Sequence, residues 1–271
     1  SIYGDTFSLT VVGHIFQRFH GKFFCADYYI GEQEFITDAN GAVVAYLGAK
    51  KDVVVPEKIN DVAPSSVAEN CFRYCDVCNV SLPKSVKNIG DFAFADCTAV
   101  AGSFSAQGVR TVGKNAFEHS GFNTVILENC TKVEENAFEN AKLQTVKLGR
   151  LTKIENGTFK NCKMLQTAYL PKLLECSSSV ASAFENCISL KSIDLTHATG
   201  LTYVGVNAFA GSGLESIDLS KNTALAELNN SAFEGCTKLV SVTVCSALKT
   251  IGANCFKNDK ALTSFVFSDS N

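Results

Sequence analysis

The stretch Val112–Leu127, VGKNAFEHSGFNTVIL, places Asn-Ala-Phe ahead of an alternating run of apolar and polar residues. Nearly the same pattern returns at Val133–Leu148, VEENAFENAKLQTVKL, and at Val204–Leu219, VGVNAFAGSGLESIDL. A single copy would describe a loop followed by a strand. Three copies indicate an internal repeat, which decides the architecture of the chain.

Nine phenylalanines mark this repeat, at spacings of 21 to 25 residues. A small residue precedes almost every one, and three positions after it comes a second, mostly small residue. The spacing lies within the window of about 20 to 29 residues that is typical of leucine-rich repeats. The nine are Phe72, Phe94, Phe117, Phe138, Phe159, Phe184, Phe209, Phe233 and Phe256.

The run Leu143–Ile154, LQTVKLGRLTKI, explains why such units must stack. Val146 and Leu148 alternate with Thr145 and Lys147, which predicts a strand with one buried and one exposed side. A single repeat cannot bury its apolar side alone, so neighbouring repeats share one core through which the phenylalanines form a ladder. Asn or Ser two residues before most of them is expected to cap a short helical turn.

The sequence therefore predicts an α/β-type repeat solenoid dominated by β structure. We expect a right-handed leucine-rich-repeat arc with a parallel sheet on its concave face and short helical turns or loops on its convex face. About nine to ten repeats fill residues 34–271, which end just after a strand and without a cap. We therefore expect either that more chain follows or that this end pairs with another segment. Residues 1–33 do not match the repeat and are expected to form a β-rich N-terminal cap.

The motif NAFxxC/S, followed by L-x-S/T-I/V-x-L and then L-x-x-I-G, resembles the BspA-like type of leucine-rich repeat. The segment Glu34–Ile59 is similar to the usual opening of that family, with a hairpin at Asn40-Gly41 and a strand at Val53–Val55. The resemblance covers about residues 34 to 271. It implies a secreted or surface-anchored protein with an adhesin-like binding role, and it names no ligand.

Composition excludes several other classes of function. The formal net charge of −3 gives no basis for a nucleic-acid groove or a polybasic membrane surface. No apolar run reaches the roughly 18 to 20 residues that span a bilayer. No signal peptide is visible at Ser1, so the surface location follows from the resemblance only.

Most of the 12 cysteines fit the repeat frame, which predicts small buried thiols rather than a disulfide or metal framework. The pair in CDVC, Cys75 to Cys78, lacks the second pair that a zinc ribbon requires, although a metal, disulfide or redox role stays open as an alternative. Eight cysteines occupy repeat positions: Cys71, Cys75, Cys97, Cys130, Cys162, Cys187, Cys236 and Cys255.

Catalytic motifs are weak, and we expect neither enzyme activity nor a cofactor. The four histidines are scattered, and phosphate-binding glycine loops are missing from the sequence. Asp194 and Asp218 stand at the same position of neighbouring SIDL strands, so their carboxylates are expected to stack about 5 Å apart. Such a pair could serve acid–base chemistry or hold a cation, but a solvated polar row is the simpler interpretation.

The exposed side of the sheet is the better candidate for a site. Phe104, Ile126, Lys147 and Tyr169 are predicted to form one amphipathic stripe across four strands of the concave face, which Asp194 and Asp218 continue. The leading hypothesis is a non-enzymatic, adhesin-like module at the cell surface that binds a host protein or a glycan through this face. The alternative is a structural spacer that displays another domain of a larger surface protein.

Overall fold

The computed structural model describes residues 34–99, 101–173 and 181–268, together with the backbone of strands at 6–11, 14–19, 22–27 and 175–176. The chain divides into two units, Ser1–Glu34 and Phe35–Asn271. The first unit holds an antiparallel sheet of β1 (Thr6–Val11), β2 (His14–Phe19) and β3 (Lys22–Asp27). Its predicted role as a cap depends on side chains outside the described residues and stays a prediction.

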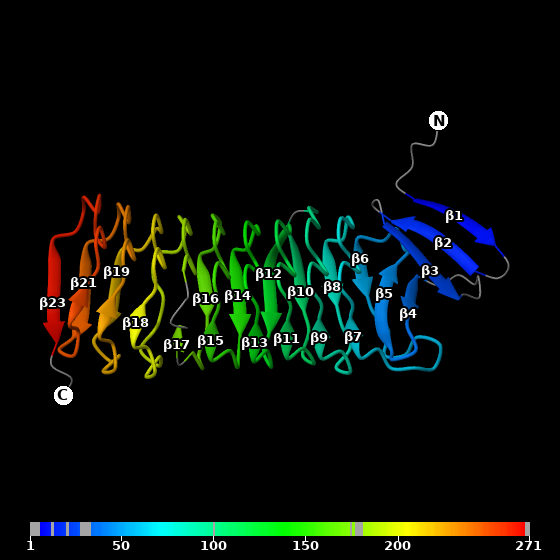
Figure 1. Ribbon diagram of the computed structural model, residues 1–271, viewed down its shortest axis with the longest axis horizontal. Helices are drawn as coiled ribbons and strands as arrows, with labels where there is room; N and C mark the ends of the chain where they lie inside the picture. The colour runs from blue at the N-terminus through cyan, green and yellow to red at the C-terminus, as the bar shows by residue number, and fades with distance from the viewer. Residues whose placement is uncertain are drawn as a thin grey trace. The chain divides into compact units, whose positions relative to one another are not determined.

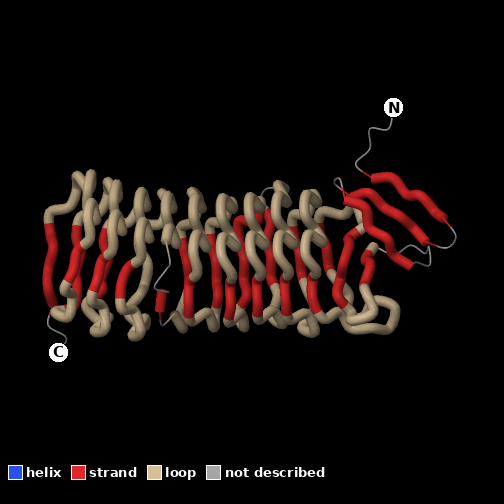
Figure 2. The backbone as a smooth tube through the Cα atoms, in the orientation of Figure 1, coloured by secondary structure: helices blue, strands red, loops and turns tan. Residues whose placement is uncertain are grey.

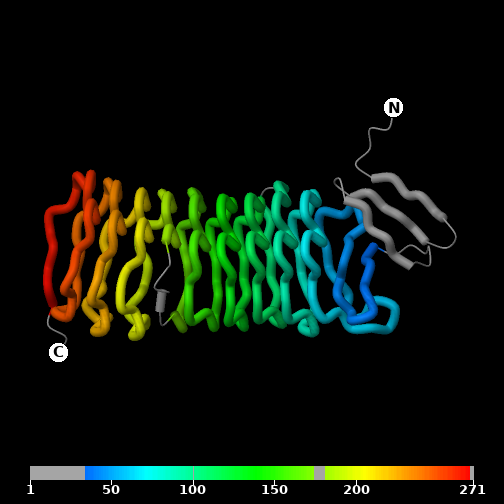
Figure 3. The backbone as a smooth tube through the Cα atoms, in the orientation of Figure 1, coloured from blue at the N-terminus to red at the C-terminus, as the bar shows by residue number. Residues whose placement is uncertain are grey.

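The second unit is a solenoid whose coils follow one another along one line in the order of the sequence (Figure 1, Figure 3). Most of the described coils contribute a longer strand to one ladder and a shorter strand to a second. We call these the long-strand ladder and the short-strand ladder. The long strands are β6 (Asp52–Val54), β8 (Asn79–Ser81), β10 (Gly102–Ser105), β12 (Phe122–Leu127), β14 (Thr145–Leu148) and β16 (Thr167–Tyr169), and after a break β19 (Ser216–Leu219), β21 (Ser241–Cys245) and β23 (Ser264–Ser268).

The short-strand ladder was not predicted from the sequence. Most of its members have two residues, and most of these pairs contain one buried apolar residue before the chain turns, as in Lys153–Ile154. Its first strands are β4 (Phe35–Thr37), β5 (Ala42–Tyr46), β7 (Ser66–Val67), β9 (Asn88–Ile89), β11 (Thr111–Val112) and β13 (Lys132–Val133). The later ones are β15 (Lys153–Ile154), β17 (Glu175–Cys176), β18 (Tyr203–Val204), β20 (Glu227–Leu228) and β22 (Thr250–Ile251).

The expected hairpin at Asn40-Gly41 is present and begins the solenoid. Strand β4 pairs antiparallel with β5, and Asp38 accepts the N–H of both Asn40 and Ala42 on its carboxylate. Gly41 lies in the left-handed region at φ 77°, which the turn requires and a side chain would strain. Tyr46 at the end of β5 stacks on Phe72 at 5.3 Å and so continues the phenylalanine ladder by one ring.

The nine phenylalanines stack face to face along the solenoid. Ring centroids of successive members lie 4.8 to 5.5 Å apart and the ring planes are within 16° of each other. Eight of the nine side chains are at most 4% exposed, and Phe256 in the last coil is half-buried. Buried aromatic side chains dominate the energetics of a core, so this ladder is the main stabilising element of the unit.

Of the two predicted forms of the segments around each phenylalanine, helical turns or loops, the structure has loops: the described residues contain no helix (Figure 2). The residue two before each phenylalanine lies in the left-handed region instead of capping a helix; Asn136, for example, has a φ of 55°. Asn tolerates that conformation, as Gly does, which explains its recurrence. The left-handed residues among the predicted caps are Asn70, Asn115, Asn136, Ser182, Asn207, Ser231 and Asn254.

The turns also bind one another. The N–H of Phe94 donates to the carbonyl of Ala116 at 2.7 Å, and that of Phe117 donates to Ala137 at 2.7 Å. The same bond recurs from coil to coil, so each Asn-Ala-Phe segment forms a third hydrogen-bonded side of the coil. Buried backbone groups are satisfied in this way without a helix.

The small residue three positions after phenylalanine is often cysteine for a specific reason. The thiols of Cys97 and Cys162 donate to the carbonyls of Phe72 and Phe138 in the preceding coil, each at 3.0 Å. Cys187 and Cys236 make the equivalent bond, at 3.1 and 3.0 Å. All eight cysteines that the repeat frame predicts to be buried are buried, which confirms that prediction.

Candidate binding surface

Alternate residues of the long strands point away from the core. In β19, for example, Ile217 and Leu219 are buried whereas Ser216 and Asp218 are exposed. We call the surface formed by these alternate side chains the outward face; it corresponds to the face predicted to be concave. Because parallel strands pair in register, its residues fall into rows that run from coil to coil.

Ile126, Lys147 and Tyr169 stand side by side in one such row. Ile126 is paired with Lys147 between β12 and β14, and Lys147 with Tyr169 between β14 and β16. The Tyr169 side chain is 54% exposed, Lys147 is exposed and Ile126 is half-buried. An apolar, a cationic and an aromatic side chain therefore lie on three adjacent strands.

The assignment of Phe104 to this stripe is wrong. Phe104 is fully buried and packs edge-on against Phe94 and Phe117, with ring centroids 4.9 Å away in both cases. The segment from Phe94 to β10 is longer than in neighbouring coils, and the register also shifts between Gly102 and Ser103. A slip of one residue exchanges the two sides of a strand, so Ser105 takes the outward place beside Ile126.

The structure does not place Asp194 and Asp218 side by side in one strand ladder. Asp218 belongs to β19, whereas residues 191–195 form no strand, so the ladder that would align the two is interrupted there. Asp194 Oδ1 accepts the hydroxyl and the N–H of Thr196, at 2.6 and 3.0 Å. Asp218 Oδ1 accepts the N–H of Ser220 at 2.9 Å. Each carboxylate closes its own turn.

The same hydrogen bonds set the charge of the two aspartates. The pKa of Asp194 is lowered mainly by its hydrogen bond to the Thr196 side chain and, to a smaller extent, by its bond to the Thr196 N–H. The side chain and N–H of Ser220 lower the pKa of Asp218 in the same way. A carboxyl with a lowered pKa stays ionised near neutral pH and makes a poor proton donor. The arrangement therefore does not support the acid–base interpretation of these residues.

A polar depression lies elsewhere on the outward face, over β6, β8 and β10. It is open to solvent and has a volume of about 140 Å³; it is lined by valines and by the polar residues Asp52, Asn79, Ser81, Ser103 and Ser105. The Asn79 amide donates to Asp52 Oδ1 at 2.7 Å and accepts the N–H and the hydroxyl of Ser103, at 2.9 and 3.0 Å. We name this group the Asn79 depression.

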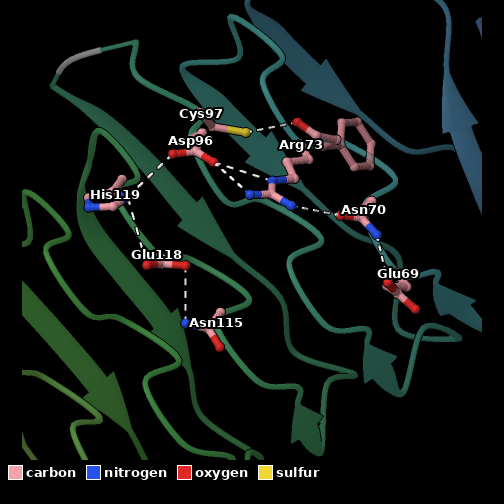
Figure 4. Close-up of polar contacts among 9 residues, drawn as sticks. Glu69, Asn70, Arg73, Asp96, Cys97, Asn115, Glu118 and His119 are labelled. Atoms are coloured by element: carbon pink, nitrogen blue, oxygen red, sulfur yellow. Dashed lines mark hydrogen bonds and ion pairs between the residues drawn. The ribbon is translucent and has the colours of Figure 1, made fainter. Parts of the chain in front are cut away.

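A second polar cluster joins the turns of three coils (Figure 4). Arg73 donates to Asp96 Oδ2 from Nε and Nη2, both at 3.3 Å, and the other oxygen of Asp96 lies 3.3 Å from His119 Nδ1. The Arg73 guanidinium also lies over the rings of Tyr74 and Phe92, 4.8 Å from each centroid. The cluster therefore links neighbouring coils by hydrogen bonds and ion pairs on the turn side of the solenoid.

This turn cluster contains bulky residues at left-handed positions. Phe92, Tyr74 and His119 have φ values of 54°, 64° and 54°. The other repeats place Asn, Asp, Ser or Gly at the equivalent sites. These three residues interrupt two columns that otherwise hold polar residues or glycine, and this interruption is visible in the sequence.

The cluster lacks the nucleophile that an Asp–His pair would activate. The nearest thiol in sequence, Cys97, is fully buried and donates to a backbone carbonyl. Burial raises the pKa of Cys97 well above its ordinary value, so the reactive thiolate is disfavoured. Within the described ranges, no three His, Cys, Asp or Glu side chains gather as metal ligands do, and no helix could cross a membrane.

Residues 65–180 and 176–271 match the family model described as "BspA type Leucine rich repeat region (6 copies)". No curated protein matches the chain in sequence. A leucine-rich repeat protein from Bacteroides ovatus is 20% identical over 96% of this chain and 71% of that protein, with a TM-score of 0.61. A leucine-rich cell surface protein from Faecalibacterium prausnitzii is 18% identical over 98% and 96% of the two chains, with a TM-score of 0.47.

Proposed function

Because the chain belongs to the BspA-type leucine-rich repeat family, we propose that it is a non-enzymatic binding module of a surface or secreted protein. Its ligand is a host or other extracellular protein, or a glycan, held on the outward face. The surface location and the adhesin-like role come from the family expectation. The choice of the outward face comes from the molecule.

One observation carries this choice: Ile126, Lys147 and Tyr169 lie in register on three adjacent strands. Their backbone is held by ladder hydrogen bonds and by a buried core beneath it, so the strands that carry them need little ordering on binding. Exposed aromatic and apolar groups next to a charge are typical of binding patches. We call these three residues the stripe.

The chemistry of the ionisable groups supports a binding role over catalysis. Asp194 and Asp218 have lowered pKa values, and Cys97 has a raised one. These directions are opposite to those that a general acid and an activated thiol require. The groups are therefore suited to structure more than to turnover.

The test is a binding screen of the purified protein against extracellular-matrix proteins and a glycan array. The variant Ile126→Ser/Tyr169→Ser removes the apolar part of the stripe. The control is Met164→Ser/Ile188→Ser, which removes two large apolar side chains, 44% and 51% exposed, that lie outside the long strands. Circular dichroism checks that all three proteins are folded.

We expect a specific hit that the stripe variant weakens at least tenfold, equivalent to about 1.4 kcal/mol, and that the control leaves unchanged. A hit that both variants bind equally well would place recognition away from the stripe. A screen without any hit would reject the binding module in favour of a spacer.

A further inference from the structure

We propose that the Asn79 depression is a saccharide-binding site, which takes a single sugar unit through its hydroxyl groups. This inference rests on the proposed function, since it assigns a ligand class to a second region of the same outward face. The stripe lies on β12, β14 and β16, whereas the depression lies on β6, β8 and β10.

The depression exists because small side chains occupy neighbouring positions of an outward row. Ser81 and Ser105 are small and occupy the row in which Val54 and Ile126 stand on either side. Val54 is 71% exposed and forms an apolar wall at one edge of the depression. Two serines between larger neighbours leave a hollow where the rest of the row is filled.

The floor of the depression is held in one arrangement by a chain of hydrogen bonds. Strand β10 pairs with β8 from Phe104 onward, so the N–H of Ser103 is left to donate to Asn79 Oδ1. That bond fixes which end of the amide is the acceptor, and the Nδ2 group must then point to Asp52. Gly102 permits this approach, because a Cβ there would overlap the carbonyl of Cys78.

The remaining polar groups match the needs of a sugar. The hydroxyls of Ser81 and Ser105 are exposed and make no hydrogen bond in the described part of the chain. Asp52 uses Oδ1 for Asn79, which leaves Oδ2 as an acceptor for a ligand hydroxyl. Sugar hydroxyls donate and accept, so a carboxylate oxygen and two rotatable hydroxyls can bind a vicinal pair.

A metal ion or an anion fits the same groups less well. Asp52 is the sole carboxylate among the lining residues, and a calcium ion takes six to eight oxygen ligands. The lining contains no cationic residue that would attract an anion. A neutral ligand rich in hydroxyl groups uses the donors and acceptors without either requirement.

The experiment is saturation-transfer-difference NMR on the folded protein with the methyl glycosides of glucose, galactose, mannose and N-acetylglucosamine. A shallow site of this kind predicts a dissociation constant on the order of 1 mM. The variant Ser81→Val/Ser105→Val fills the depression with strand-compatible side chains. Asp52→Asn removes only the charge, and Thr243→Val on β21 is the matched control on the same face.

We expect at least one glycoside to receive saturation from the wild type and from Thr243→Val, and Ser81→Val/Ser105→Val to abolish the signal. Asp52→Asn should weaken binding about tenfold, and its near-identical shape keeps the test valid if the double variant loses stability. No signal with any glycoside, or a signal unchanged in both variants, would overturn the inference. If that happened while a screening hit still depended on the stripe, the proposed function would stand without this site.

Discussion

Asn136 illustrates how single residues specify the turn side of the solenoid. Its φ of 55° belongs to the left-handed region, which costs an ordinary residue about 1–2 kcal/mol and costs Asn and Gly less. The sequence alone could not separate this role from helix capping, because Asn is favoured in both places for related reasons. The backbone conformation decides between them.

Replacing Asn136 tests this assignment. Asn136→Ala should lower the melting temperature by roughly 2–4 °C, because alanine pays about 1 kcal/mol for the left-handed conformation. Asn136→Gly should melt close to the wild type. Asn123→Ala, at a position whose φ is not positive, is the control. Equal effects of Ala and Gly at position 136 would contradict the conformational explanation.

Asp259 departs from the cysteine column in the last described coil. It stands three residues after Phe256, is 9% exposed, and has two carboxyl oxygens without hydrogen-bond partners in the described structure. Burial raises its pKa to about 6, against about 3.9 in an unfolded chain. The native state therefore binds more protons than the unfolded state between these values, so the contribution of Asp259 to stability falls as the pH rises from about 4 to about 6.

Asp259→Ser should consequently raise the melting temperature at about pH 7 and have much less effect at about pH 4. Serine already occupies the equivalent position at Ser120 and Ser212. The difference between variant and wild-type melting temperatures isolates this group from the other carboxylates. A gain that is the same at both pH values would show that Asp259 is not the titrating group.

At the scale of elements, the ladders and the core follow from alternation and period. Strand β14 can be predicted from the sequence of Thr145–Leu148, because its four residues alternate between the outward and the buried side. The short-strand ladder cannot be predicted in this way, since a pair such as Lys153–Ile154 is too short to show a period. The outward residue of β10 is Ser105 and not Phe104, because its coil contains extra residues before the strand and the length of the coil alone does not show where they are accommodated.

The phenylalanine ladder predicts a graded response to truncation. Phe138 stacks between Phe117 and Phe159 and is fully buried, so Phe138→Ala should cost about 3–5 kcal/mol. Phe256 is half-buried and stacks on Phe233 at the last ring of the ladder, so Phe256→Ala should cost clearly less. Thermal unfolding followed by circular dichroism measures both. Equal losses would mean that the coils do not share one continuous core.

At the scale of the molecule, stacked coils convert a sequence period into a rigid surface. Most of the described coils bind their neighbours through two strand ladders and a turn ladder, and they present a few outward side chains at fixed spacing. Ile126, Lys147 and Tyr169 could be assigned to that surface from their strand positions. The Asn79 depression could not, because it depends on where β10 begins to pair with β8 and on the side-chain bonds that result.

The central claim is that this outward face is where ligands bind, and protection of Lys147 from acetylation tests it most directly. The wild-type protein is labelled at its lysines with and without the matrix protein or glycan found in the screen, and mass spectrometry gives the rate at each site. Lys147 on the stripe should be acetylated more slowly in the complex, while Lys142, exposed on the preceding turn segment, keeps its rate. Unchanged labelling of Lys147 in a saturated complex would contradict the account.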